Sequence, residues 1–190
     1  MVAGDRADVP RADFDSEGRL MRARQIASPN QDQRPIGVPV SLLVIHNISL
    51  PPGEFGGSAV VDLFLNCLDH SSHPYYDGLR GLELSSHFLL RRDGDLIQFV
   101  PCERRAWHAG ASHWNGRERC NDFSIGVELE GSDDLAFTDA QYSGLAQLTR
   151  EIQRRYPIED IVGHSDIAPG RKTDPGPLFD WARYRSLITS

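Results

Sequence analysis

The apolar residues of this chain form short runs that predict the strands of one sheet. Residues 41–48, SLLVIHNI, are almost continuously apolar, which is typical of a central strand buried on both faces. In residues 123–131, FSIGVELEG, apolar side chains alternate with small or acidic ones, which indicates a second strand. Residues 158–164, IEDIVGH, predict a short strand that ends at His164.

A hairpin is predicted between residues 83 and 100. Two apolar runs flank the pair Asp93-Gly94 there, and this dipeptide is the strongest short-range signal for a tight β-hairpin.

The clearest helical pattern covers residues 138–157, where apolar residues recur every three or four positions. Thr138 and Gln141 have the spacing of a capping box at its start. Shorter helices are expected in residues 59–68 and in residues 179–188.

Strands with interspersed helices indicate an α/β fold, a layered domain with a central mixed β-sheet flanked by helices. No repeat and no second domain stand out, so a single domain is expected over residues 21–190. Residues 1–20 are polar, acidic in balance and without periodicity, which predicts a flexible N-terminal arm.

The composition of the chain excludes some classes of binding partner. A formal net charge of −7 disfavours nucleic acid and anionic membrane surfaces, which need basic surface. No apolar run approaches the roughly 18 residues of a membrane span, and residues 1–20 lack the apolar core of a signal peptide. Three cysteines without a C-x-x-C pair are expected to be free thiols in a reducing compartment. These features together favour the cytoplasm.

Two histidines and one aspartate are candidates for a metal site. His46 and His164 each end a predicted strand, and Asp174 lies in the Pro- and Gly-rich segment 163–177. Two imidazoles and one carboxylate form a ligand set of catalytic zinc that leaves one position for water. The spacing is long and discontinuous, so hydrogen-bonded structural histidines remain the alternative on the residues alone.

Glu128 and Lys172 are candidates for polar catalytic roles. Glu128 and Glu130 share the polar side of the predicted strand 123–131. If the sheet is covered on both faces, one of these carboxylates is buried, which is costly for a group without a role. A solvated strand face and an exposed loop lysine are the alternatives.

Two loop segments offer candidate walls for a substrate cleft. Trp107 and His108 lie in RRAWHAG, and Arg119 lies in GRERC, where a guanidinium suits a carboxylate. Core packing and a solvated turn are the alternatives. The other histidines show no convergent arrangement and are expected to be structural or exposed: His70, His73, His87 and His113.

Several long segments, taken in order, resemble one family closely. They include LLVIHNISLPPGEFGG, HPYYDGL, RRDGDLIQFVP, RAWHAG, GRERCNDFSIGVELEG and GHSDIAPGRKTDPGPLFDWAR. These segments are similar to the AmpD-type anhydro-N-acetylmuramyl-L-alanine amidases, relatives of the N-acetylmuramoyl-L-alanine amidases and of peptidoglycan recognition proteins. The resemblance extends from about residue 20 to 187. It implies that family's fold, a mixed sheet flanked by helices.

The resemblance also implies roles for the candidate residues. It implies one zinc ion bound by His46, His164 and Asp174, and it implies Glu128 and Lys172 as the catalytic residues. It further implies a set of residues that line the substrate cleft: Asn47, Tyr75, Trp107, His108 and Arg119.

The implied reaction is zinc-dependent hydrolysis of the amide between the lactyl group of anhydro-N-acetylmuramic acid and L-alanine. Its expected setting is cytoplasmic recycling of peptidoglycan, with a muropeptide as substrate and a monomeric enzyme. Two alternatives remain open at this point. One is an amidase that acts on intact cell-wall peptidoglycan, and the other is a protein that binds muropeptides without cleaving them.

Overall fold

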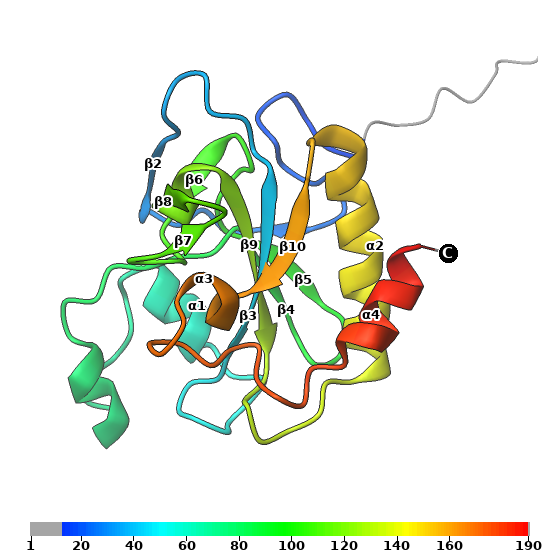
Figure 1. Cartoon of the computed structure of the whole chain (residues 1–190). Helices are drawn as coiled ribbons and strands as arrows, with labels where there is room; N and C mark the ends of the chain where they lie inside the picture. Colours follow the sequence, from blue (N-terminus) through cyan, green and yellow to red (C-terminus); the bar gives the residue numbers. More distant parts are fainter. Residues whose placement is uncertain (1–12, 190) are drawn as a thin grey trace, which may run out of the picture.

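Two seven-residue strands, β3 (Leu42–Ile48) and β9 (Ser124–Glu130), form the centre of a six-stranded sheet (Figure 1). The structure is a computed structural model and describes residues 13–189. The strand order is β1-β5-β4-β9-β3-β10, and every neighbouring pair is parallel except β4 and β5. The sheet is therefore mixed, as predicted. The other four strands are β1 (Arg24–Gln25), β4 (Phe88–Leu90), β5 (Leu96–Gln98) and β10 (Asp160–Gly163).

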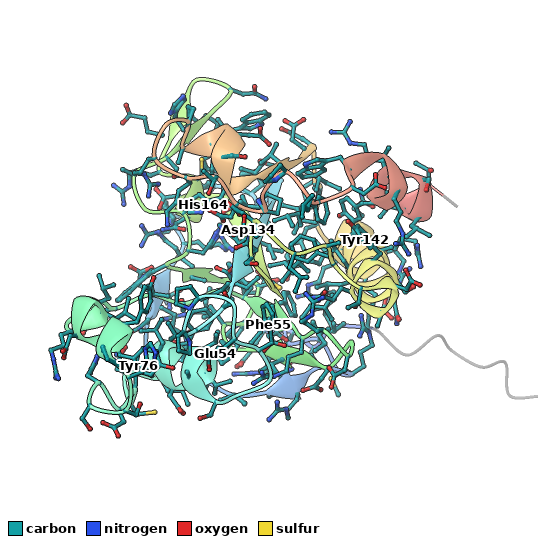
Figure 2. All side chains as sticks on the ribbon, turned by 90° about the horizontal axis from the view of Figure 1, so that it is seen from below. Glu54, Phe55, Tyr76, Asp134, Tyr142 and His164 are labelled. Carbon is teal, nitrogen blue, oxygen red and sulfur yellow. The ribbon has the colours of Figure 1, made fainter. Side chains whose placement is uncertain are left out.

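Helices cover both faces of the sheet. In both views α1 (Ala59–Phe64) lies on one side, and α2 (Asp139–Arg155) with α4 (Trp181–Ile188) lies on the other (Figures 1 and 2). The alternation in β9 explains this layering, because its apolar residues belong to the buried cluster that includes the inner face of α2. All three predicted helices are confirmed. Within residues 13–189, no helix combines the length and apolar character needed to cross a membrane.

Local signals in the sequence account for two of these elements. The capping box of α2 is present: the Thr138 hydroxyl accepts from the Gln141 backbone, and the Gln141 side chain accepts from the Thr138 backbone. The predicted hairpin is formed by β4 and β5. Its turn is a three-residue loop closed by a bond from Arg91 N to Asp95 O, and Gly94 takes the positive φ of 93°.

Short elements complete the fold around the sheet. An antiparallel pair, a small hairpin, two 3-10 helices and a single α-helical turn lie in the connections. They are β2 (Gln31–Gln33) with β6 (Arg104–Ala106), β7 (His113–Trp114) with β8 (Arg117–Glu118), η1 (Pro74–Leu79), η2 (Cys120–Asp122) and α3 (His164–Ile167).

The packed domain begins earlier than the sequence predicts. The predicted flexible arm covered residues 1–20, of which 1–12 lie outside the described residues. Residues 13–20 are part of the fold, because Phe14 and Leu20 are buried in the same cluster as α2. Two apolar anchors in a polar stretch are too sparse to produce a periodic signal.

The segment after β10 also differs from expectation. The sequence predicts a strand that ends at His164, followed by a loop without helix. In the structure the strand ends at Gly163 and His164 begins α3, a single turn before the loop. The Asp166 carboxylate accepts from the Gly163 backbone and caps this turn.

Candidate active site

Three side chains converge at the edge where β3 and β10 end. His46 Nδ1, His164 Nδ1 and Asp174 Oδ2 each lie 3.0 Å from the other two. β3 and β10 are parallel neighbours, so His46 near the end of β3 meets His164 directly after β10. Figure 2 views the molecule from this end and labels His164. The structure thus brings together the three residues predicted as metal ligands.

The hydrogen bonds around the histidines show which nitrogen carries the proton. His164 Nε2 lies 3.2 Å from the Ala109 carbonyl oxygen, which only accepts, so this nitrogen carries the proton. In the neutral ring the lone pair is then on His164 Nδ1, which faces His46 and Asp174. Burial lowers the pKa of His46 to about 4, so its imidazole is neutral.

The donor set fits a zinc ion. Burial alone would raise the pKa of Asp174, but contacts from His164 and His46 outweigh it and hold that pKa below its usual range. Two neutral imidazoles and an ionised carboxylate are typical ligands of catalytic zinc. Among the described residues this is the one cluster of at least three such donors whose ligand atoms are this close together.

Glu128 lies next to this cluster as a buried carboxylate. It is directly opposite His46 on β9, and its Oε2 atom is buried without a hydrogen-bond partner among the described residues. Burial raises the pKa of Glu128 well above its usual value, the charge of Asp174 adds to the rise, and Lys172 opposes it.

Glu130, on the same strand face, is a buried carboxylate whose oxygens are hydrogen-bonded. It accepts from the Arg91 guanidinium at 2.8 Å and from the backbone N–H groups of Gly56 and Arg92. Both acidic residues predicted on this face are buried, but Glu130 is fully paired and Glu128 is not. Native proteins rarely leave a buried carboxylate oxygen unpaired without a functional reason.

Lys172 lies on the loop between His164 and Asp174. Its side chain is exposed, and its backbone N–H bonds to the Ala168 carbonyl. Its positive charge lowers the pKa of both Glu128 and His46, against and together with the effect of burial respectively. Lys172 is also the only lysine in a sequence that otherwise uses arginine.

Comparisons with known proteins show the family of this chain. The family model of N-acetylmuramoyl-L-alanine amidases (Amidase_2) matches residues 36–177, which include all five of these polar residues. The chain belongs to the N-acetylmuramoyl-L-alanine amidase family.

Individual members of this family are similar over most of the chain. The 1,6-anhydro-N-acetylmuramyl-L-alanine amidase AmpD of Citrobacter freundii is 57% identical over 175 residues, which are 91% of this chain and 94% of that protein. A crystal structure of a Se-Met AmpD derivative, also 57% identical, covers 92% of this chain and 98% of that one, with a TM-score of 0.90. Escherichia coli AmiD, solved in complex with anhydro-N-acetylmuramic acid-L-Ala-D-γ-Glu-L-Lys, is 32% identical, with a TM-score of 0.57. That match covers 92% of this chain and 65% of AmiD.

Asn47 is predicted to line the substrate cleft, but its side-chain amide forms hydrogen bonds within the protein. The Asn47 amide donates to Asp133 Oδ1 at 2.8 Å and to the Pro175 carbonyl at 3.0 Å. Pro175 directly follows the candidate ligand Asp174. Asn47 therefore fastens the loop that carries this ligand to the end of β3.

The other predicted cleft residues lie at different depths. Trp107 is half-buried, and its Nε1–H has no hydrogen-bond partner among the described residues. His108 is buried, with Nδ1 at 2.9 Å from His46 Nε2. Tyr75 is half-exposed in η1.

Arg119 lines a hollow of about 530 Å³, and none of the three metal donors is among the residues that line it. Its side chain is 70% exposed and faces Asp122 at 3.3 Å. Sequence reasoning missed Arg171, which lines the same hollow and donates to the carbonyls of Ala109 and Ala111. Its position next to Lys172 in the sequence could have drawn attention to Arg171. The two carbonyl groups that it contacts are about 60 residues away in the chain, so the sequence does not reveal these bonds.

Proposed function

We propose that this chain is a zinc-dependent amidase that cleaves the amide between the lactyl group of anhydro-N-acetylmuramic acid and L-alanine. The observation that carries the proposal is a buried carboxylate oxygen of Glu128, which has no hydrogen-bond partner within residues 13–189, beside three converging metal donors. Family membership supports amide hydrolysis, and the activity named for the relative from Citrobacter freundii supports the anhydro-muramyl substrate.

His46, His164 and Asp174 would hold the zinc ion. When bound, zinc polarises the amide carbonyl and lowers the pKa of a water molecule from about 15.7 toward about 7. A single carboxylate among the three ligands preserves positive charge on the ion, which supports this acidity. The loop bond from Ser165 N to Asp174 O and the Asn47 bonds keep the carboxylate in place.

Glu128 would act as the general base and then as the general acid. Its buried place directly opposite His46 suits a carboxylate that takes a proton from water and delivers it. The proton would pass from water to Glu128 Oε2 and then to the departing nitrogen of L-alanine. General acid–base catalysis of this kind contributes roughly 10²–10⁴-fold to the rate.

Lys172 would stabilise the oxyanion that forms when water attacks the carbonyl. Its ammonium is a compact point charge on a flexible stem, which allows it to follow the developing charge. The loop bond to Ala168 fixes only its backbone, so the side chain stays available to the substrate.

The substrate class is a muropeptide. Escherichia coli AmiD has been solved with an anhydro-muramyl tripeptide, and that ligand carries peptide carboxylates. Arg119 offers an exposed guanidinium for such a group in an otherwise acidic protein. The cytoplasmic location and the monomeric state stay predictions.

Product analysis separates this proposal from the two alternatives. The purified protein is incubated with anhydro-muramyl-tripeptide and, separately, with whole sacculi, and released peptides are measured by mass spectrometry. We expect fast release from the soluble substrate and slow release from sacculi. Equal rates would favour a cell-wall amidase, and binding without release would favour a recognition protein.

A further inference from the structure

His108 lies behind the candidate ligand His46, at the end away from the metal donors. Its Nδ1 atom is 2.9 Å from His46 Nε2, and its Nε2 atom is 3.1 Å from Ser124 Oγ. The His46 and His108 rings cross edge to face, with centroids 5.0 Å apart. Both ring nitrogens of His108 are therefore engaged inside the protein.

We propose that His108 is a positioning residue that sets the tautomer and the ring orientation of the metal ligand His46. This inference rests on the proposed function, which assigns His46 Nδ1 to the zinc ion. The sequence predicts His108 as a wall of the substrate cleft, but its side chain is only 9% exposed and faces His46 instead.

With His46 Nδ1 assigned to the metal, the two hydrogen bonds fix the position of the remaining ring protons. For His46 Nδ1 to keep a free lone pair toward the other donors, the proton of its neutral ring must be on Nε2. That N–H donates to His108 Nδ1, which must then be unprotonated. The proton of the neutral His108 ring is on Nε2 and is donated to Ser124 Oγ. In this series of hydrogen bonds, the tautomer of His46 fixes the tautomer of His108.

One face of β9 provides the seat for the His108 ring. Residues two apart on a strand point to the same side, so Ser124, Gly126 and Glu128 share a face. A Cβ atom at Gly126 would lie 2.5 Å from Cγ of His108, so only glycine leaves room for the ring. The same strand face thus holds the hydroxyl that fixes His108, the space for its ring, and the candidate base.

Two variants distinguish the effect of a hydrogen-bond acceptor at residue 108 from the effect of side-chain volume there. His108→Asn places an amide oxygen near the former Nδ1 atom and keeps the acceptor for His46 Nε2–H. His108→Leu fills similar space without an acceptor. Groups that support a metal-bound histidine typically contribute 10–100-fold to metal affinity. We expect zinc binding about 10–100-fold weaker in His108→Leu and close to the wild-type value in His108→Asn.

Nitrogen-15 NMR tests the position of the proton without any variant. In the zinc-loaded wild type and in zinc-loaded His108→Asn we expect the His46 proton on Nε2. In the metal-free wild type we expect a hydrogen bond between His46 Nε2 and His108 Nδ1, detected as a coupling between the two nitrogens. A His46 Nε2 without a proton in the zinc-loaded wild type overturns the inference. So does equal zinc affinity in the wild type and His108→Leu.

The outcomes distinguish this inference from the proposed function. If the wild type binds no zinc, the proposed function fails, whereas the NMR result on metal-free protein still decides the His46–His108 bond. If the wild type binds zinc and cleaves substrate but His108→Leu is unchanged in affinity, only the positioning role fails. Should His108→Leu not fold, His108→Asn and the wild-type spectrum carry the test.

Discussion

His46 and Glu128 lie directly opposite each other on the neighbouring parallel strands β3 and β9. The two side chains therefore leave the sheet on the same face, and Glu128 Oε2 has no hydrogen-bond partner among the described residues. One parallel ladder thus holds a proposed metal ligand beside the proposed base. The other two proposed ligands, His164 and Asp174, lie in α3 and in the loop after it. Sites built on strands hold their geometry better than sites built on loops.

Glu128→Gln should stabilise the metal-free protein while it removes activity. The pKa of Glu128 is raised in the folded state, so the wild type loses stability as pH rises from 4.5 through the folded pKa. At pH 7 glutamine avoids the buried charge, and we expect a gain of about 1–3 kcal/mol in the free energy of unfolding.

Chemical unfolding in the presence of a chelator, at pH 7 and at pH 4.5, measures this difference. The gain should shrink at the lower pH, where the folded carboxyl keeps its proton and the unfolded one is about half protonated. A Glu128→Gln protein that is less stable than the wild type at both pH values would mean that the carboxylate has an unrecognised structural partner.

Lys172→Gln should retain zinc but lose roughly 10²–10³-fold in kcat, since it removes the cation that faces the oxyanion. Lys172→Arg keeps the charge in a different shape and should recover part of the loss.

Because Lys172 is the only lysine, an amine-acylating reagent modifies it and the N-terminus alone. Acylation should inactivate the wild type and leave the residual activity of Lys172→Arg unaltered; an acylated wild type with full kcat would exclude the role.

Arg91→Met should be strongly destabilising. Arg91 and Glu130 form an ion pair of 2.8 Å whose side chains are 11% and 4% exposed, so removing the cation leaves a buried charge. Breaking such a pair typically costs about 3–5 kcal/mol. Arg24→Met is the matched control, because its pair with Asp95 is exposed and is expected to contribute under about 1 kcal/mol. Equal losses in the two variants, measured by denaturant unfolding, would contradict the distinction.

Much of this fold could be predicted from the sequence, because its strands follow simple periods. The alternation in residues 123–131 placed Glu128 and Glu130 on one face, and the capping pair Thr138 and Gln141 marked the start of α2. Neither signal reveals strand register. That Glu128 is opposite His46 depends on pairing between residues about 80 positions apart.

The sequence could not show which polar side chains would form hydrogen bonds within the protein. Asn47 bonds to Asp133, and Arg171 bonds to Ala109, across gaps of 86 and 62 residues. The N-terminal boundary was missed for the same reason. The Gln98 side chain accepts from Leu20 N at 2.7 Å and donates to Gly18 O at 2.8 Å, so a residue about 80 positions away holds this segment in the fold. Local composition carries no information on such contacts.

Zinc titration of the chelated protein, with hydrolysis of anhydro-muramyl-tripeptide followed by mass spectrometry, tests the central claim most directly. We expect no cleavage without metal, and activity that rises with added zinc and levels off at one equivalent per chain. His164→Ala, which removes one of the three donors, should stay inactive at the same zinc concentrations. Full activity in the chelated wild type, or activity that does not depend on zinc, would contradict the account.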